Sequence, residues 1–366
     1  MRFNFTGKIE ANKLEAKVPF FKKIDNYDGY TLNLTCIAAP NNRAYCEVTS
    51  FKYDQIKYYD SNNVENEIDW EDRFKEEHLK KATNKTVITF IDKSRYEFLS
   101  AYDFILFAKD NIDKINGKRF TITGRVRKNE YKGKITDRFE IQHMYELEEN
   151  DTKKNQLRVS GDFYFNKESI DSADWKKEKK IYINGWTKEN LDKDHKGVYI
   201  SKQVIFDCHK ADLDNEIHFE KINFQFKQIG LAMDEDKEIV SKLKKNKYYQ
   251  IGITLSYSNG NEEVEFDESQ LTDNQKQMIK LGLAELNDFR PKGNIYGDRK
   301  ITFNYKGFNL IGDYADGMIV LDDPDFESHI YIPSAQENFE DMMNPPENTE
   351  NKKEDSNNDL DDLFGD

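Results

Sequence analysis

One stretch of sequence decides which fold the chain is expected to adopt. Residues 118–142 read KRFTITGRVRKNEYKGKITDRFEIQ. Two runs of alternating apolar and polar residues flank the turn-forming segment 129–133, and this pattern predicts a long β-hairpin that ends near Leu147. Because side chains alternate along a strand, the first run has two different faces. The apolar face carries Phe120, Ile122, Gly124 and Val126, and the other face carries Arg119, Thr121, Thr123, Arg125 and Arg127.

This basic hairpin (residues 118–138) stands out in an acidic chain. The 366 residues carry a formal net charge of −14, whereas residues 118–138 hold eight basic and two acidic residues. Cations along one β-face bind successive phosphates, and an arginine also stacks on a base, so the pattern favours nucleic-acid binding. The alternative is a solvated hairpin whose charges only keep it soluble. The predicted contacts are Lys118, Arg119, Arg125, Arg127, Lys128, Tyr131, Lys132, Lys134 and Arg138.

The elements around the hairpin occur twice in the same order. In the first half, strands are predicted over 2–10, 30–38, 43–51 and 86–91, and a helix follows a capping box at Ser94. In the second half, strands are predicted over 156–166, 180–186, 197–206 and 218–229. A helix over 234–245 and a hairpin over 247–267, with its turn at 258–261, complete that half. Each half therefore has the element order of the OB-fold, a five-stranded Greek-key barrel.

The resulting expectation is a mainly β protein with tandem OB-fold-like barrels, short helices, a C-terminal β-extension and a disordered acidic tail. The first module spans residues 1–148, a polar linker 149–155, and the second module 156–288. A helix is predicted to open at Thr272 and to run through Leu286. The extension spans 289–334 and contains predicted strands over 300–306, 308–314, 318–321 and 329–332. The tail spans 335–366.

Two such modules and an acidic, apolar-tipped tail resemble the replicative single-stranded DNA-binding proteins of bacteria and their phages. Over residues 1–288 the resemblance lies in the order of the predicted elements. In the tail it lies in the short acidic and apolar motif. It implies a non-enzymatic protein without a cofactor that coats and protects single-stranded DNA during replication, recombination or repair. It further implies that the tail recruits replication or repair proteins in the cytoplasm of a bacterial or phage-infected cell.

The tail combines negative charge with a short apolar motif. Residues 336–366 hold eleven acidic and two basic residues. The acids steer toward a basic groove and the apolar residues fill a pocket, which is typical of a docking motif. An inert solubilising tail is the alternative. The residues predicted to dock are Asp359, Leu360, Asp361, Asp362, Leu363 and Phe364.

Two further patches mix cations with aromatic residues. The first lies between the first two strands, and the second falls on the central strands of the second module. Bases stack on aromatic rings, although packing inside a barrel explains most aromatic residues equally well. The predicted nucleic-acid contacts are Phe20, Phe21, Lys22 and Lys23 in the first patch and Trp186, Lys188 and Tyr199 in the second, which also includes Tyr182 and Lys202.

Several other classes of protein are disfavoured. The longest apolar run, 104–108, is far shorter than the ~20 residues that span a bilayer, and the N-terminus lacks the apolar region of a secretory signal. Three scattered cysteines indicate neither a disulfide framework nor a zinc site. The chain is expected to be a monomer or weak oligomer without a metal. Two alternatives remain: a structural or assembly protein of a phage, and a Mg²⁺-dependent nuclease using the acids of 322–327.

Overall fold

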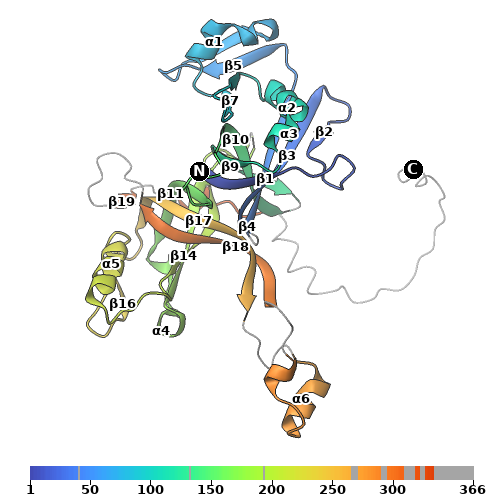
Figure 1. The fold of residues 1–366 in the computed structure, drawn as a ribbon. Coiled ribbons are helices and arrows are strands. Elements are labelled where there is room, and N and C mark those ends of the chain that lie inside the picture. The colour runs from blue at the N-terminus through green and yellow to red at the C-terminus, as the bar shows by residue number, and fades with distance from the viewer. Residues whose placement is uncertain are drawn as a thin grey trace, which may run out of the picture.

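The computed structural model describes residues 1–39, 42–131, 133–192, 194–264, 271–289, 295–308, 318–321 and 326–333. Within these residues the chain is mainly β, and most of its strands belong to one continuous sheet. That sheet closes on itself twice, so two barrels lie side by side (Figure 1). The predicted fold class, tandem OB-fold-like barrels, is confirmed.

The first barrel is a closed ring of five strands. They are β1 (Arg2–Glu10), β3 (Gly29–Ala39), β4 (Asn42–Phe51), β9 (Arg119–Tyr131) and β10 (Lys134–Glu146). β1 pairs with β3 and β9, β3 with β4, and β9 with β10, all antiparallel. The ring closes where β10 meets β4 in parallel at Phe139 and Cys46. This is the OB-fold strand order, and the predicted hairpin supplies its last two strands.

The second barrel repeats this ring. Its strands are β11 (Gln156–Asn166), β13 (Lys180–Glu189), β14 (Val198–Asp207), β17 (Tyr248–Val264) and β18 (Ile295–Phe308). β11 pairs with β13 and β17, β13 with β14, and β17 with β18, while β14 meets β18 in parallel at Ile205 and Asn304. The strand that closes the ring therefore comes from 289–334, the segment that the sequence set apart as an extension.

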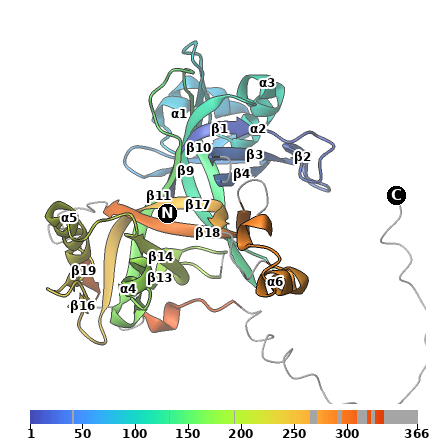
Figure 2. The same cartoon turned by 60° about the horizontal axis from the view of Figure 1, so that its bottom comes forward.

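The two barrels share one sheet and one core. The first half of β1 pairs antiparallel with β11, with Phe5 opposite Leu157. Both β11 and β17 lie between the barrels in Figures 1 and 2. Beneath them, buried residues of both rings form one hydrophobic cluster, in which the Phe139 and Tyr257 rings meet edge to face at 5.2 Å. The barrels are thus fused by a strand pair and by apolar packing.

Smaller elements decorate the barrels. In the first half they are β2 (Phe21–Lys23), β5 (Gln55–Tyr59), β6 (Glu65–Asp69), η1 (Trp70–Phe74), α1 (Glu76–Lys81), β7 (Thr86–Thr89), β8 (Arg95–Phe98), α2 (Ala101–Asp110) and α3 (Ile112–Ile115). In the second half they are η2 (Lys167–Ser169), β12 (Ile170–Asp171), α4 (Trp175–Glu178), α5 (Glu216–Lys227), β15 (Leu231–Met233) and β16 (Ile239–Ser241). They are followed by α6 (Asp273–Lys280), η4 (Leu286–Phe289), β19 (Met318–Leu321) and η5 (Glu327–His329). Figure 1 shows β5 and α1 above the first barrel and α6 at the far end of the arm that β17 and β18 form.

Three predicted helices differ from the structure. The first does not begin at Ser94, because 95–98 forms β8; the helix is α2, whose N-cap Ser100 accepts a hydrogen bond from the Tyr102 amide. The predicted helix over 234–245 is instead part of a hairpin in which β15 pairs with β16. The capping box at Thr272 is present, but α6 ends at Lys280 rather than at Leu286.

Three predicted strand features are also wrong. Residues 218–229 are not a strand: α5 covers most of them and buries Ile222 and Phe226, four residues apart, while the N-cap Asn215 accepts bonds from two amides. The predicted turn at 258–261 does not exist, since β17 continues through it to Val264. Residues 329–332 form no regular strand, and only Ile330 bridges to Tyr199. The predicted strand 318–321 is confirmed as β19, and 309–314 lies outside the described residues.

None of the helices in the described part of the chain is long and apolar enough to span a membrane.

Candidate functional site

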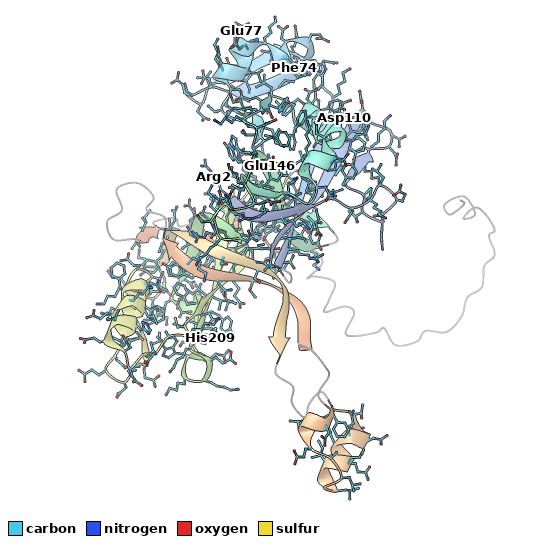
Figure 3. The ribbon with its side chains drawn as sticks, in the orientation of Figure 1. Arg2, Phe74, Glu77, Asp110, Glu146 and His209 are labelled. Atoms are coloured by element: carbon cyan, nitrogen blue, oxygen red, sulfur yellow. The ribbon has the colours of Figure 1, made fainter. Side chains whose placement is uncertain are left out.

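Four arginines gather on the outer face of the sheet where the two barrels meet. Arg125 and Arg127 come from β9, Arg2 from β1 and Arg158 from β11, three strands that lie side by side. All four side chains are exposed. Arg2 is directly opposite Arg125, and Arg158 is opposite Asn4, two residues farther along β1. Arg2, which Figure 3 labels, lies at the junction of the barrels. We call these four residues the arginine band.

The arginine band is only partly neutralised by its surroundings, through Glu140, which lies opposite Arg125 on β10. Glu140 of β10 accepts a 2.7 Å hydrogen bond from Arg127, and both side chains are partly exposed. Among the described residues, the side chains of Arg2, Arg125 and Arg158 make no ion pair and no hydrogen bond. Like charges directly opposite each other on a sheet are destabilising. An anion that bridges these guanidinium groups would relieve the repulsion, because each offers planar N–H donors that match phosphate.

The other predicted residues of the basic hairpin have different roles. Arg119 donates to Asn155 and to the carbonyls of Asp151 and Lys153, so it fastens the linker between the barrels. Arg138 forms a 2.9 Å ion pair with Glu47. Lys118 and Lys134 are exposed. Lys132 and the side chain of Tyr131 lie outside what the structure describes.

Lys128 lies on the inner face of the hairpin, so it does not join the exposed row of cations. Its side chain is only 6% exposed, and its ammonium lies 2.5 Å from Asp137 Oδ1. Lys202 of β14 approaches the other carboxylate oxygen of Asp137 at 3.4 Å and is 3% exposed. Two lysines from different barrels therefore share one carboxylate.

This buried cluster borders a cavity of about 390 Å³ between the barrels. The first barrel contributes Tyr45, Lys134 and Phe139 to its lining, and the second contributes Gln203 and Thr302. The Lys202 ammonium also lies 3.4 Å from the centre of the Phe303 ring, a cation–π contact. With both lysines charged, the cluster has one excess positive charge, so the cavity favours an anion.

The burial of these groups changes how they titrate. Desolvation lowers the pKa of Lys202 to about 7, although the Asp137 carboxylate partly opposes it. For Asp137, burial alone would raise the pKa, but the charges of Lys202 and Lys128 outweigh it and the pKa is lowered. Lys202 thus changes its charge close to neutral pH, unlike an exposed lysine.

Only part of the patch between the first two strands is accessible to a ligand. Phe20 is a core residue, 7% exposed. Phe21, on β2, stacks on Tyr30 with 5.1 Å between ring centres. Lys22 and Lys23 are exposed and could contact an anion. Of the four predicted contacts, the structure therefore presents the two lysines to solvent and buries one phenylalanine.

The aromatic residues predicted in the second module do share one face. Trp186 of β13 and Tyr199 of β14 point outward with Tyr164 of β11 and Tyr248 of β17. We call these four residues the aromatic platform. Lys188 lies at its margin, with its ammonium 5.2 Å from the centre of the Tyr199 ring. The platform is not open, because Phe326 covers it and leaves Tyr199 only 3% exposed.

Sequence reasoning missed Arg2, Arg158 and Phe326 as parts of these sites. It grouped Lys202 with the aromatic patch of the second module and missed its burial beside Asp137. Arg2 and Arg158 stand at solvent-facing positions of predicted strands, which is a detectable pattern. Their nearness to Arg125 depends on the β1–β9 and β1–β11 registers, which alternation along each strand does not encode. Lys202 lies at an inward position between Ile200 and Val204, where a charged residue is a warning of a special site.

The predicted docking motif, residues 359–364, lies outside the described residues, as do 322–325 of the acidic cluster considered for a nuclease. Within the part of the chain that the structure describes, no group of three or more His, Cys, Asp or Glu side chains could hold a metal ion.

Comparisons with known proteins give little further information. No protein-family model matches the sequence. A search of curated proteins also finds no match. Among solved structures, the chain is similar to a deletion mutant of the single-stranded DNA-binding protein from Thermus aquaticus, with 9% sequence identity and a TM-score of 0.28. That similarity covers 70% of this chain and 86% of the other. At this TM-score it supports no argument about the present protein.

Proposed function

We propose that the chain binds single-stranded DNA, with the arginine band as its main phosphate contact. The observation that carries this proposal is the direct opposition of Arg2 and Arg125, with Arg158 diagonal to them. Neighbouring strands are about 4.8 Å apart, so arginines on β9, β1 and β11 span roughly 10 Å of the sheet. Such a row fits a flexible backbone that follows the sheet surface and reads no sequence.

The junction cavity offers a second place for an anion. Lys128 and Lys202 share the single carboxylate of Asp137, so a phosphate would find one uncompensated positive charge there. Lys134, also in the lining, is exposed to solvent. A phosphate near Lys202 would favour the charged ammonium and raise the pKa of that group. The cavity is therefore expected to bind DNA more weakly at high pH.

The proposed cellular role follows the sequence analysis. The protein would coat and protect single-stranded DNA during replication, recombination or repair, as a cytoplasmic monomer or weak oligomer without catalytic activity. Residues 359–364 would dock onto partner proteins. Because the tail is acidic, it would also compete with DNA for the arginine band. Salt would weaken that competition by screening the charges.

The test is a titration of fluorescent oligonucleotides of one sequence as single-stranded DNA, as RNA and as duplex, at several salt concentrations. We expect a preference for single-stranded DNA. If about five phosphates are engaged, the slope of log affinity against log salt should be near −3.5, at ~0.7 per phosphate. Absence of binding at ~50 mM salt, where phosphate contacts are strong, would contradict the proposal and favour a structural or assembly protein. Mg²⁺-dependent degradation of the oligonucleotide would favour the nuclease.

A further inference from the structure

The aromatic platform has the composition of a base-stacking site. Tyr164 lies opposite Trp186 on the neighbouring strand, and its ring meets Tyr199 edge to face at 5.0 Å. Tyr248 extends the same surface from the other side of β11, through the β11–β17 pair. Four large aromatic side chains on one outward face exceed what the interior of the barrel requires, since the core lies on the opposite face.

Phe326 occupies the centre of this platform. Its ring centre lies 3.9 Å from that of Tyr199 and 4.2 Å from that of Tyr248, with interplanar angles of 33° and 24°. Trp186 meets the same ring edge to face at 5.5 Å. Phe326 is 1% exposed, so it is fully inserted. A flat ring held nearly parallel to two others is also the arrangement of a nucleobase on an aromatic surface.

The residues after Phe326 contact both barrels, and they include Ile330, which bridges to Tyr199, and Tyr331, whose ring centre lies 5.0 Å from that of His195. The Tyr331 amide donates to the Tyr199 carbonyl at 2.9 Å, and Tyr248 donates its hydroxyl to Glu327 at 2.8 Å. The Tyr331 hydroxyl donates to Glu130, near the tip of the basic hairpin. Residues 326–333, which we call the strap, therefore run from the platform of the second barrel to the hairpin of the first.

Several features of the strap would allow it to dissociate from the aromatic platform. Ile332 is 67% exposed, and Phe326 is the one apolar side chain of the strap that is fully buried among the described residues. The acidic side chains of its two side-chain hydrogen bonds, Glu327 and Glu130, would be repelled by an incoming phosphate. Displacing Phe326 would exchange one stacked ring for another, so a nucleobase would replace the stacking that Phe326 loses.

From these contacts we infer that the aromatic platform is a stacking site for a nucleobase of single-stranded DNA, and that the strap occupies it until DNA displaces Phe326. The inference deepens the proposed function and rests on it. The arginine band engages the DNA backbone first, and strap release then extends the bound length of DNA onto the second barrel. The protein would therefore have a short footprint with the strap closed and a longer one with the strap open.

Phe326→Ala tests the inference in the full-length chain. Since each aromatic contact contributes ~0.5–1.5 kcal/mol, loss of stacking on two rings should open the strap and tighten binding of a thirty-nucleotide oligo(dT) about tenfold. Ile332→Ala is the matched control, because it truncates an exposed apolar residue of the same strap, and it should leave affinity unchanged. Adding Trp186→Leu to Phe326→Ala should abolish the gain, since the base then loses part of its platform.

Hydrogen exchange supplies a second measurement that needs no variant. Adding oligo(dT) to the wild-type protein should speed exchange of the Tyr331 amide, which bonds to the Tyr199 carbonyl in the closed state. If the wild type binds oligo(dT) while Phe326→Ala binds no more tightly and Tyr331 keeps its protection, the strap is a permanent part of the barrel and the inference is wrong. If neither protein binds oligo(dT), the proposed function fails and the inference fails with it. Binding by Phe326→Ala alone would support the platform and remove the arginine band from the proposed function.

Discussion

The first barrel presents three of the four exposed arginines of the arginine band on its outer face, whereas the second presents aromatic rings covered by a segment of its own chain. Both are closed rings with the same strand order, and they share the β1–β11 strand pair. The difference therefore lies in the outward-facing residues and in where the chain goes after the ring closes. An anion can therefore approach the first barrel directly. It can reach the aromatic rings of the second barrel only after a contact within the chain has been broken.

The largest expected effect on DNA affinity comes from removing the charges of the arginine band. Replacing Arg2, Arg125 and Arg158 with Gln should weaken single-stranded DNA binding about a hundredfold at ~50 mM salt and reduce the salt slope by about 2, at ~0.7 per phosphate. A salt-dependent fluorescence titration measures both. The variant should melt no lower than the wild type, because the substitutions remove a repulsion between like charges.

The control for this variant removes three charges elsewhere. Lys81 on α1, Lys177 on α4 and Lys276 on α6 are exposed and lie outside the arginine band. Their replacement with Gln gives the same change in net charge. Equal loss of affinity in the two triple variants would mean that total charge, and not the arginine band, governs binding.

A second prediction concerns how the two barrels close. A Cβ at Gly7 of β1 would lie 2.3 Å from the Ile37 carbonyl oxygen, and one at Gly185 of β13 would lie 2.2 Å from the Tyr164 carbonyl oxygen. Each glycine lets the first and second strands of its ring approach. Gly7→Ala and Gly185→Ala should each lower the free energy of unfolding by about 2 kcal/mol, as overpacking does. Denaturant unfolding measures this.

Gly161 provides the matched substitution. A Cβ there would approach only Met1, with its nearest atom, in the flexible side chain, at 3.0 Å. Gly161→Ala should therefore change stability little. If all three variants lost the same stability, the loss would come from glycine replacement in strands in general, and the two close approaches would have no special role.

The third prediction concerns pH and the joint between the barrels. The pKa of Lys202 is lowered to about 7 in the folded protein, whereas an unfolded lysine titrates near 10.4. Between these values the unfolded chain binds more protons, so the free energy of unfolding should rise with pH, by at most ~1.4 kcal/mol per unit. Below pH ~7 both states are protonated and this dependence should vanish.

Lys202→Met isolates this effect. Melting temperatures of the wild type and the variant, measured from pH 6 to pH 9.5, should differ most at low pH and converge as pH rises, because the buried ammonium is then neutral in the wild type. Parallel curves would show that Lys202 titrates normally. Oligonucleotide affinity should be measured over the same pH range. Above pH ~7, where the cavity loses its excess charge, the wild type should lose more affinity than the variant.

The smallest expected effect comes from the tail. Deleting residues 336–366 removes eleven acidic and two basic residues and leaves the strap in place. Single-stranded DNA should bind two- to threefold more tightly at ~50 mM salt, and the gain should fade at ~200 mM, where charges are screened beyond about a Debye length. Unchanged affinity at low salt would mean that the tail does not compete for the arginine band.

The strands of the barrels were predicted well because apolar and polar residues alternate clearly along them. Phe120, Ile122 and Val126 are buried as expected, while Arg125 and Arg127 are exposed. Where helix and strand periods overlap, the prediction failed. Ile222 and Phe226, four residues apart, fit one face of a helix as well as one face of a strand, and tertiary packing placed them on α5.

The candidate sites were less predictable, because they depend on residues far apart in the sequence. Lys128 was predicted to contact phosphate, but it continues the inward row of Ile122 and Val126, and its charge is buried beside Asp137 and Lys202. Likewise, the aromatic residues of the second barrel were predicted to meet DNA. Their cover by Phe326 depends on the path of the chain after β19, which no local pattern encodes.

The position of β18 has a consequence for synthesis of the chain. The first barrel has all its strands once residue 146 has been made, but the second cannot close before residue 308. At ~5–20 residues per second, a ribosome needs roughly 8 to 30 s to extend the chain from β11 to the end of β18. From the time each is made until β18 is complete, β14 and β17 have unpaired edges that invite association with other chains. A fragment that stops at residue 288 would keep those edges permanently.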